Sequence, residues 1–215
     1  MKTLNQYIKE KLIINKDYSD AGLSSKSFDE LRKIIEDRYD KLGSGTEQDP
    51  IDFNDVDVSN LNSFYSSNIG KGIFQGTQFK YIDISSWDVS NVTNMMAMFF
   101  SCKDLKSVGD ISSWDVSKVT DMSFMFYNCL SFNQDISKWK VSSVTDMNHM
   151  FYRCESFNRD ISKWDVSGVK DMSFMFDFCE SFNQDISKWN VSKVSDKAGM
   201  FHCCSIKGEY MPKFK

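Results

Sequence analysis

Six cysteines and two histidines are the side chains that could ligate a metal ion or pair as nucleophile and base. Five of the cysteines follow one another at intervals of 27, 25, 25 and 25 residues: Cys102, Cys129, Cys154, Cys179 and Cys204. Each cysteine continues the three- and four-residue spacing of the apolar residues in its unit. This favours buried free thiols over a metal or disulfide role. Zinc sites use paired cysteines or histidines. Only Cys203 and Cys204 are close, and adjacent cysteines are poorly placed to share one ion, so we predict no metal and no cofactor.

Aspartates recur at three positions of the same period and could form a calcium ladder. The columns are Asp83, Asp110, Asp135, Asp160 and Asp185; Asp121, Asp146, Asp171 and Asp196; and Asp88, Asp115 and Asp165. Calcium ladders of this kind use glycine-rich loops, which the sequence lacks. We therefore expect the aspartates to cap turns through backbone hydrogen bonds. Asn133, Asn158 and Asn183 are expected to form a hydrogen-bonded ladder of their own.

No residue pattern points to catalysis. His149 and His202 occupy different positions of the repeat, and the sequence offers no evident Ser/His/Asp set, catalytic carboxylate pair or phosphate-binding loop. A catalytic site usually interrupts a repeat, and here only the ends are irregular. We predict that the chain is not an enzyme.

The tryptophans share the period of the cysteines: Trp87, Trp114, Trp139, Trp164 and Trp189. The unit reads D-I-S-x-W-x-V-S-x-V-x-D-M-x-x-M-F-x-x-C-x-S-F-N-x, with units beginning at 52, 83, 110, 135, 160 and 185. A period between 20 and 50 residues is typical of units that bury their apolar faces against their neighbours. The tryptophan and cysteine columns are therefore expected to form the structural core, and the first and last units are degenerate caps.

Two periods coexist within a unit. Trp139 and Val141 alternate with polar residues, as in a short strand, whereas Val144 to Phe157 follow spacings of three and four, as in a helix or 3-10 segment. One strand and one helical arc in each turn is the plan of a leucine-rich repeat. We predict an α/β repeat, a leucine-rich-repeat-like solenoid of about five full turns plus caps over residues 52–209, with a tail at 210–215.

Residues 1–42 are expected to be a helical N-terminal segment. Leu4, Tyr7, Ile8 and Leu12 indicate a short amphipathic helix. A second helix is predicted by a capping box of Ser27 and Glu30, by apolar residues at helical spacing up to Leu42, and by Gly43 at its end. Residues 43–51, rich in glycine and polar residues, are predicted to be a linker.

Composition excludes several classes of protein. The formal net charge is −4 and the basic residues are dispersed, so nucleic acid is not an expected partner. No stretch approaches the roughly 20 apolar residues of a membrane span. The first ten residues lack the apolar core of a signal peptide. We expect the chain in the cytoplasm of the producing or host cell, or in a virion.

Columns that vary between units are the candidate binding residues, because packing constrains them less. They are Lys138, Lys163 and Lys188; Tyr127 and Tyr152; and Phe124, His149 and Phe174. Aromatic residues presented in register would suit contacts with a protein partner.

The motif W-D-V-S-x-V-T-D-M-x-x-M-F-x-x-C-x-S-F-N-Q-D-I-S resembles a known family over about residues 52–205. It is similar to the BspA-like leucine-rich-repeat surface proteins and to the related repeat of mycoplasma lipoproteins, a domain of unknown function. The resemblance implies a right-handed β/α solenoid and a role in protein binding or adhesion.

The first ten residues resemble the head-targeting leaders of proteins packaged into large tailed-phage capsids, in which cleavage follows a motif matched by Ile8-Lys9-Glu10. Similar leader-plus-repeat proteins are encoded by phages of gut Bacteroidales. An ordinary amphipathic helix is the alternative. We therefore expect a non-enzymatic protein-protein interaction module, or else a structural or head-packaged phage protein whose N-terminal leader is cleaved after Glu10.

Overall fold

The computed structural model describes residues 27–214. Its elements are helix α2 (Phe28–Leu42), strands β1 (Ile51–Asp52), β2 (Tyr65–Ser66), β3 (Lys71–Gly72) and β4 (Ile82–Asp83), and the 3-10 helix η1 (Gly208–Tyr210). Strands β1 and β4 pair in parallel, with Ile51 opposite Ile82, and β2 and β3 pair antiparallel, with Tyr65 opposite Gly72. The short helix predicted from Leu4 to Leu12 and the leader motif lie outside the described residues.

The predicted α/β leucine-rich-repeat-like solenoid is wrong. Between residues 84 and 207 the chain consists of turns, bends and isolated bridges, with neither a helix nor a strand of two or more residues. The apolar residues spaced three and four apart, which predicted a helical arc, lie instead in consecutive turns. Each turn is closed by a backbone hydrogen bond between residues three apart. These bonds run from Met150 to Met147, from Tyr152 to His149 and from Cys154 to Phe151, with N···O distances of 3.2, 3.1 and 2.9 Å.

The predicted strand is also replaced by turns. The N–H of Trp139 donates to the carbonyl of Ile136 at 3.2 Å, and the N–H of Val144 donates to that of Val141 at 2.9 Å. Trp139 and Val141 are both buried while Lys140 between them is exposed, so the alternation of apolar and polar residues is real. Here it arises from successive turns, which place side chains on opposite sides without an extended backbone.

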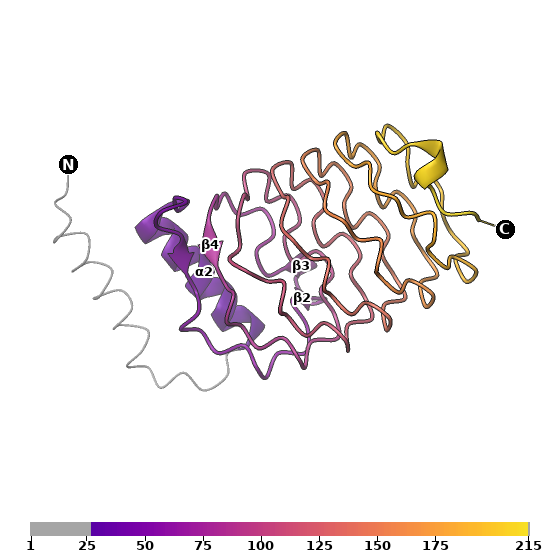
Figure 1. The fold of residues 1–215 in the computed structure, drawn as a ribbon. Coiled ribbons are helices and arrows are strands. Elements are labelled where there is room, and N and C mark those ends of the chain that lie inside the picture. The colour runs from indigo at the N-terminus through magenta and orange to yellow at the C-terminus, as the bar shows by residue number, and fades with distance from the viewer. Residues whose placement is uncertain (1–26, 215) are drawn as a thin grey trace.

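Neighbouring repeat units are joined by a ladder of backbone hydrogen bonds, and Figure 1 shows the units side by side in chain order, from magenta to yellow. Alternate N–H groups of one unit donate to carbonyls of the next. For the unit from 110 the bonds are Met122 to Asp146, Phe124 to Asn148, Phe126 to Met150 and Asn128 to Tyr152, at 3.0, 3.0, 3.0 and 2.6 Å. Isolated parallel bridges, such as Asp121 with Asp146, mark the same contact. We call residues 52–209 the repeat array.

The ladder uses left-handed backbone at two positions of each unit. One position is occupied by Ala97, Phe124, His149, Phe174 and Gly199, and the other by Ser101, Asn128, Arg153, Phe178 and Cys203, with φ between 52° and 60°. Left-handed φ costs an L-residue about 1–2 kcal/mol. Its recurrence at the same two positions shows that the inter-unit bonds impose it.

A single hydrophobic cluster runs through the repeat array and includes residues of α2. Equivalent rings of successive units stack: the centroids of Phe126 and Phe151 are 5.7 Å apart, and those of Phe151 and Phe176 are 5.6 Å apart, with ring planes within 10° of parallel. Each unit thus completes its core with side chains of the next.

Helix α2 closes the first end of the array. The predicted capping box is confirmed, since Ser27 and Glu30 exchange both of its hydrogen bonds, and the N–H of Gly43 donates to the carbonyl of Tyr39 at 2.8 Å. Leu31, Ile34 and Ile35 of α2 are buried in the cluster.

A buried cation fixes the helix in place. The Arg38 side chain is only 1% exposed, and its Nη1 and Nη2 donate to the two carboxylate oxygens of Asp55 at 2.8 and 2.6 Å. Arg38 also donates to the carbonyl of Asp52.

The segments flanking the array pack against it. In the predicted linker, the carbonyl of Ser44 accepts from Lys80 and Tyr81 at 2.7 and 3.1 Å. Gly45 lies so close to the chain that an added Cβ would be 2.1 Å from the carbonyl oxygen of Tyr81. At the other end, the carbonyl of Tyr210 in η1 accepts from the N–H of Ile186 at 3.0 Å. Within residues 27–214 no helix has the length and apolar character needed to cross a membrane.

Substitution of Trp139 by alanine should lower the free energy of unfolding by about 3–5 kcal/mol, because a large buried ring is lost and a cavity remains. Trp139 stacks on Trp114 at 6.3 Å and donates from Nε1 to the carbonyl of Ile111 at 2.9 Å. Urea unfolding measures the change. The control is the exposed neighbour Lys138, whose substitution by alanine should change stability by less than about 0.5 kcal/mol. An unchanged unfolding midpoint for Trp139→Ala would show that this ring is not shared between units.

Substitution of Asp55 by alanine should destabilise the protein by about 3 kcal/mol, because the buried Arg38 charge loses its counter-charge. The matched control is Glu36→Ala, which removes the exposed partner of Arg32 on the same helix. An exposed pair contributes about 1 kcal/mol or less. Equal effects of the two variants in chemical denaturation would contradict a structural role for the Arg38 contact.

Candidate functional site

The tryptophan column lies inside the array and connects consecutive units. Its members are buried, with exposed fractions of 3–5%. The indole Nε1 donates to a carbonyl one unit earlier in four of the five. These bonds are Trp87 to Phe53, Trp139 to Ile111, Trp164 to Ile136 and Trp189 to Ile161, at 2.8, 2.9, 3.1 and 3.2 Å. The indole Nε1 of Trp114 has no hydrogen-bond acceptor within residues 27–214, and this tryptophan follows the unit of 27 residues.

The cysteine column is a second internal line of contacts. Each buried thiol donates to a carbonyl of the preceding unit: Cys102 to Phe74, Cys129 to Phe99, Cys154 to Phe126 and Cys179 to Phe151, at 2.9–3.0 Å. Burial raises the pKa of Cys129, Cys154 and Cys179 well above the usual range. Cys204 is half-buried and Cys203 is exposed. All six thiols are free.

The aspartate columns cap turns. In each, an Oδ1 atom accepts from the N–H two residues later, as in Asp135 with Ser137 at 3.0 Å and Asp171 with Ser173 at 2.8 Å. The backbone N–H of Ser137 lowers the pKa of Asp135, whereas burial raises the pKa of Asp146. The part of the chain that the structure describes holds no group of three or more Cys, His, Asp or Glu side chains arranged for a metal ion.

The predicted asparagine ladder is present. The Oδ1 of Asn133 accepts from the N–H of Asn158 at 3.1 Å, and that of Asn158 accepts from Asn183 at 3.0 Å. Asn183 in turn accepts from the N–H of Lys207 at 3.0 Å. These side chains hold the register of the units and are not available to a ligand through this oxygen.

The lysine column is exposed, but acidic groups accompany it. Lys138, Lys163 and Lys188 all lie at the surface. Lys163 lines a shallow depression of about 240 Å³ together with Asp135, Arg159 and Asp160. The charge of Lys138 contributes to lowering the pKa of Asp135 and of Asp110, after the hydrogen bonds from their serines. Acidic side chains therefore lie between the lysines, and this surface is not a basic patch.

The two aromatic columns come together in one continuous surface. Phe124, His149 and Phe174 stack with centroid separations of 4.7 and 4.9 Å. Beside them Phe100, Tyr127 and Tyr152 stack at 4.5 and 4.6 Å with planes within 5° of parallel. Tilted contacts join the columns, such as His149 with Tyr152 at 5.7 Å. All six rings are half-buried. We call these six residues the aromatic stripe.

The left-handed backbone sets one column of the stripe. Phe124, His149 and Phe174 have φ values of 56°, 53° and 54°. The equivalent residues at the two ends are small, Ala97 and Gly199. A Cβ on Gly199 would lie 2.5 Å from Cε1 of the Phe174 ring, so the glycine makes room for the last ring of the stripe.

The second column of the stripe ends at a contact between an aspartate and a histidine. Where Tyr127 and Tyr152 predict another aromatic residue, the chain has Asp177, which is 4% exposed. Its Oδ1 is 2.8 Å from Nδ1 of His202, the equivalent residue one unit later. Sequence reasoning missed this contact. The signal was present, since both residues interrupt an aromatic column and lie 25 positions apart.

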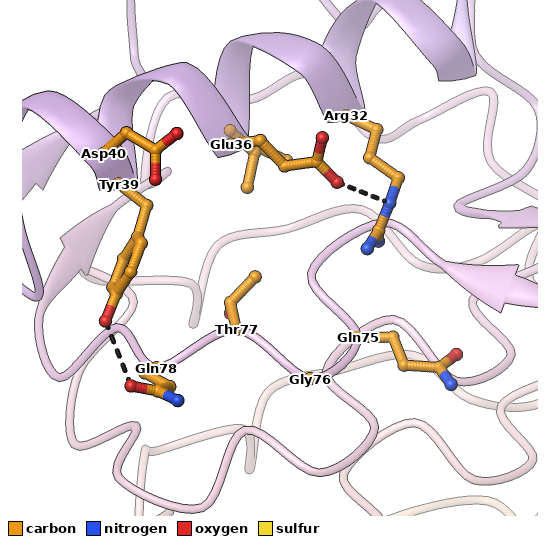
Figure 2. Close-up of a pocket in the computed structure, with 9 residues that line it drawn as sticks. Arg32, Glu36, Tyr39, Asp40, Gln75, Gly76, Thr77 and Gln78 are labelled. Atoms are coloured by element: carbon orange, nitrogen blue, oxygen red, sulfur yellow. Dashed lines mark hydrogen bonds and ion pairs between the residues drawn. The ribbon is translucent and has the colours of Figure 1, made fainter.

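A hollow of about 390 Å³ lies between α2 and the loop Gln75–Gln78, and Figure 2 shows the side chains around it. Arg32 pairs with Glu36 across one turn of the helix at 3.2 Å. Tyr39 donates from its hydroxyl to Oε1 of Gln78 at 3.1 Å. The hollow is open, and the sequence predicted no binding residue there.

The cysteines should separate into reactive and shielded thiols under native conditions without reductant. Cys102, Cys129, Cys154 and Cys179 are buried and bonded to carbonyls, so a thiol reagent should label them only upon unfolding. Time-resolved labelling followed by peptide mass spectrometry measures each rate, with the same protein in denaturant as the control. Rapid labelling of these four thiols in the folded state would contradict the buried column.

Residues 48–152 and 134–209 match the family described as mycoplasma protein of unknown function, DUF285. No curated protein and no solved structure matches the chain. The two matched segments together span the whole repeat array, in which the tryptophan, cysteine and asparagine columns hold the units together. The match is consistent with the resemblance to BspA-like repeat proteins, and it does not bear on a phage origin. The chain belongs to the mycoplasma DUF285 family.

Proposed function

We propose that this chain is a non-enzymatic interaction module that binds a protein partner through the aromatic stripe. The observation that carries the proposal is the left-handed backbone at Phe124, His149 and Phe174. Glycine or asparagine adopts this conformation with little strain, whereas a bulky residue there is an outlier. The ladder imposes this φ in every unit, and at this position the three central units carry rings that stack at the surface, whereas the end units carry Ala97 and Gly199.

The rings of the stripe are rigid and partly exposed, which suits a binding surface. Stacking restrains the rings of each column, and the central rings of His149 and Tyr127 lie between two neighbours. Little side-chain freedom therefore remains to be lost on association. Aromatic residues dominate the energy of protein interfaces. Because stacked ring faces cover one another, the exposed part of these half-buried rings consists mainly of their edges. Sugar-binding platforms use exposed ring faces, so a protein surface is the better match.

Acidic groups beside the stripe indicate the chemistry of the partner. Asp146 and Asp171 are half-buried, and their charges act on His149, whose pKa is lowered chiefly by burial. Asn148 lies between Asp146 and His149: its Nδ2 donates to Oδ1 of Asp146 at 2.6 Å, and its Oδ1 is 3.1 Å from Nδ1 of His149. A partner segment that combines apolar side chains with lysine or arginine complements this surface.

The double variant Phe124→Asn, Phe174→Asn should lose partner binding by at least about tenfold while the protein stays as stable as the wild type. Relief of left-handed strain, about 1–2 kcal/mol per residue, offsets the lost stacking, about 0.5–1.5 kcal/mol per ring pair. Quantitative affinity capture with wild type and variant side by side, followed by titration of the captured protein, measures the loss. Thermal unfolding checks the fold.

The matched control reverses the other candidate column: Lys138, Lys163 and Lys188 to glutamate. If the stripe is the binding surface, this triple variant should retain the partner. If the lysines bind instead, affinity falls in the lysine variant, the loss shrinks with added salt, and the stripe variant binds normally. That result would overturn the proposal.

A role as a head-packaged phage protein remains the alternative from the sequence. It rests on Ile8-Lys9-Glu10, outside the described residues, and none of the contacts described above favours it. A mature chain beginning at Lys11 in mass spectrometry of the native protein would support it.

A further inference from the structure

The last two repeat units together form a cluster of three side chains that the core does not need. His202 contacts Asp177 through Nδ1 at 2.8 Å, and its Nε2 lies 3.7 Å from Sγ of Cys203. The imidazole therefore lies between a carboxylate and a thiol, with one ring nitrogen directed at each. Cys203 is the one cysteine outside the 25-residue column.

The carboxylate determines which nitrogen carries the proton. An ionised aspartate can only accept hydrogen bonds, so Nδ1 of His202 is the donor and Nε2 is left with its lone pair toward the thiol. A base positioned by a third group and directed at a nucleophile is the arrangement that activates cysteine in enzymes. Asp177 is buried, with a side chain 6% exposed, and this anchors the ring although His202 itself is 62% exposed.

The position of Cys203 at the end of the array adds a second feature. In each of the three preceding units the equivalent N–H donates to the following unit: Asn128 to Tyr152, Arg153 to Asp177 and Phe178 to His202. Within residues 27–214 no further unit follows the one from 185, and no carbonyl there accepts from the N–H of Cys203. Free backbone donors beside a sulfur stabilise negative charge on it.

We propose that Cys203 is a reactive thiol that undergoes exchange with small-molecule disulfides, with His202 as its base and Asp177 as the residue that positions the imidazole. Nε2 of His202 takes the thiol proton, and the Cys203 thiolate attacks one sulfur of the disulfide. A new S–S bond forms to Cys203, the original S–S bond breaks, and the departing thiolate takes the proton from His202. One disulfide and one protein thiol become one mixed disulfide and one free thiol.

The neighbouring thiol does not carry the exchange further. Cys204 is half-buried, and burial raises its pKa to about 11, so little of it is thiolate near neutral pH. The other four thiols are buried in the column. The mixed disulfide on Cys203 is therefore the stable product, and the inference does not depend on whether the aromatic stripe binds a partner.

The experiment follows release of the chromophore from 5,5′-dithiobis(2-nitrobenzoate) by the folded full-length chain at pH 7, with glutathione as the reference thiol. One equivalent should react at least about tenfold faster than glutathione. The fast phase should vanish in Cys203→Ser and persist in the control Cys204→Ser. With oxidised glutathione as the probe, intact mass should show one adduct, on Cys203. A fast-phase rate equal to that of glutathione would mark an ordinary surface thiol and overturn the proposal.

The role of the histidine is tested by chemical rescue. His202→Ala should slow the fast phase about tenfold or more, and added imidazole should restore it, because the exposed site admits the free base. A structural role would not respond to imidazole. If His202→Ala lowers the unfolding temperature, His202→Gln serves as the second variant, with the same slow rate expected. An unchanged rate in both variants would overturn the assignment.

The variant Asp177→Asn tests whether Asp177 positions the imidazole of His202, by comparing the loss of rate in the single variants with that in the double variant. Alone it should slow the fast phase several-fold. Combined with His202→Ala it should add nothing, because Asp177 acts only through the imidazole. A further loss in the double variant would show that Asp177 supports the local fold instead, and would remove it from the site.

Discussion

The backbone ladder between units is the constraint on which the rest of the structure depends. The turns of the array bring the peptide groups of neighbouring units together, and buried peptide groups need partners. Carbonyls of one unit are satisfied by N–H groups of the preceding unit, for example Phe126 with Met150. The geometry of these bonds requires two left-handed residues per unit. Stacking in the core follows from the ladder. Because the bonds pair the same positions of successive units, each phenylalanine lies over its equivalent in the next unit.

Side-chain columns reinforce the ladder from within. The Trp139 indole and the Cys154 thiol both donate to carbonyls of the preceding unit. At the surface Asn158 also joins units on both sides: its backbone N–H donates to Oδ1 of Asn133, and its own Oδ1 accepts from the N–H of Asn183. Positions that carry such bonds cannot vary without loss of stability. Variation is therefore confined to outward-facing positions, and these include the stripe and the lysine column.

The two ends of the array differ in how they complete this pattern. At the first end, α2 covers the core with Leu31, Ile34 and Ile35, and Arg38 replaces a missing unit by bonding to Asp55. At the last end, η1 bonds to Ile186, but the N–H of Cys203, whose equivalents in the earlier units are ladder donors, has no carbonyl acceptor within residues 27–214. This asymmetry leaves the Cys203 thiol and the His202 imidazole exposed beside the buried Asp177 carboxylate, whereas Phe100, Tyr127 and Tyr152, the equivalents of His202, are half-buried. The end of the repeat is thus where new chemistry is sterically possible.

Much of the molecule could be read from the sequence, because it rests on local chemistry or on a strict period. The 25-residue spacing identified Trp139 and Cys154 as members of columns. Ser27 and Glu30 marked the start of α2, and the lack of glycine-rich loops indicated turn caps at the aspartates. Each of these properties follows from residue type and spacing alone, without knowledge of contacts between units.

Only the tertiary structure decided the form of the backbone and the contacts between columns. A series of turns and a short helix share apolar spacings of three and four, so the residues from Val144 to Phe157 could not distinguish them. Nothing about Phe124 or His149 signals left-handed φ, since bulky residues adopt it only when neighbouring units impose it. The contact of Asp177 with His202 likewise depends on the register of two units, which no local pattern encodes.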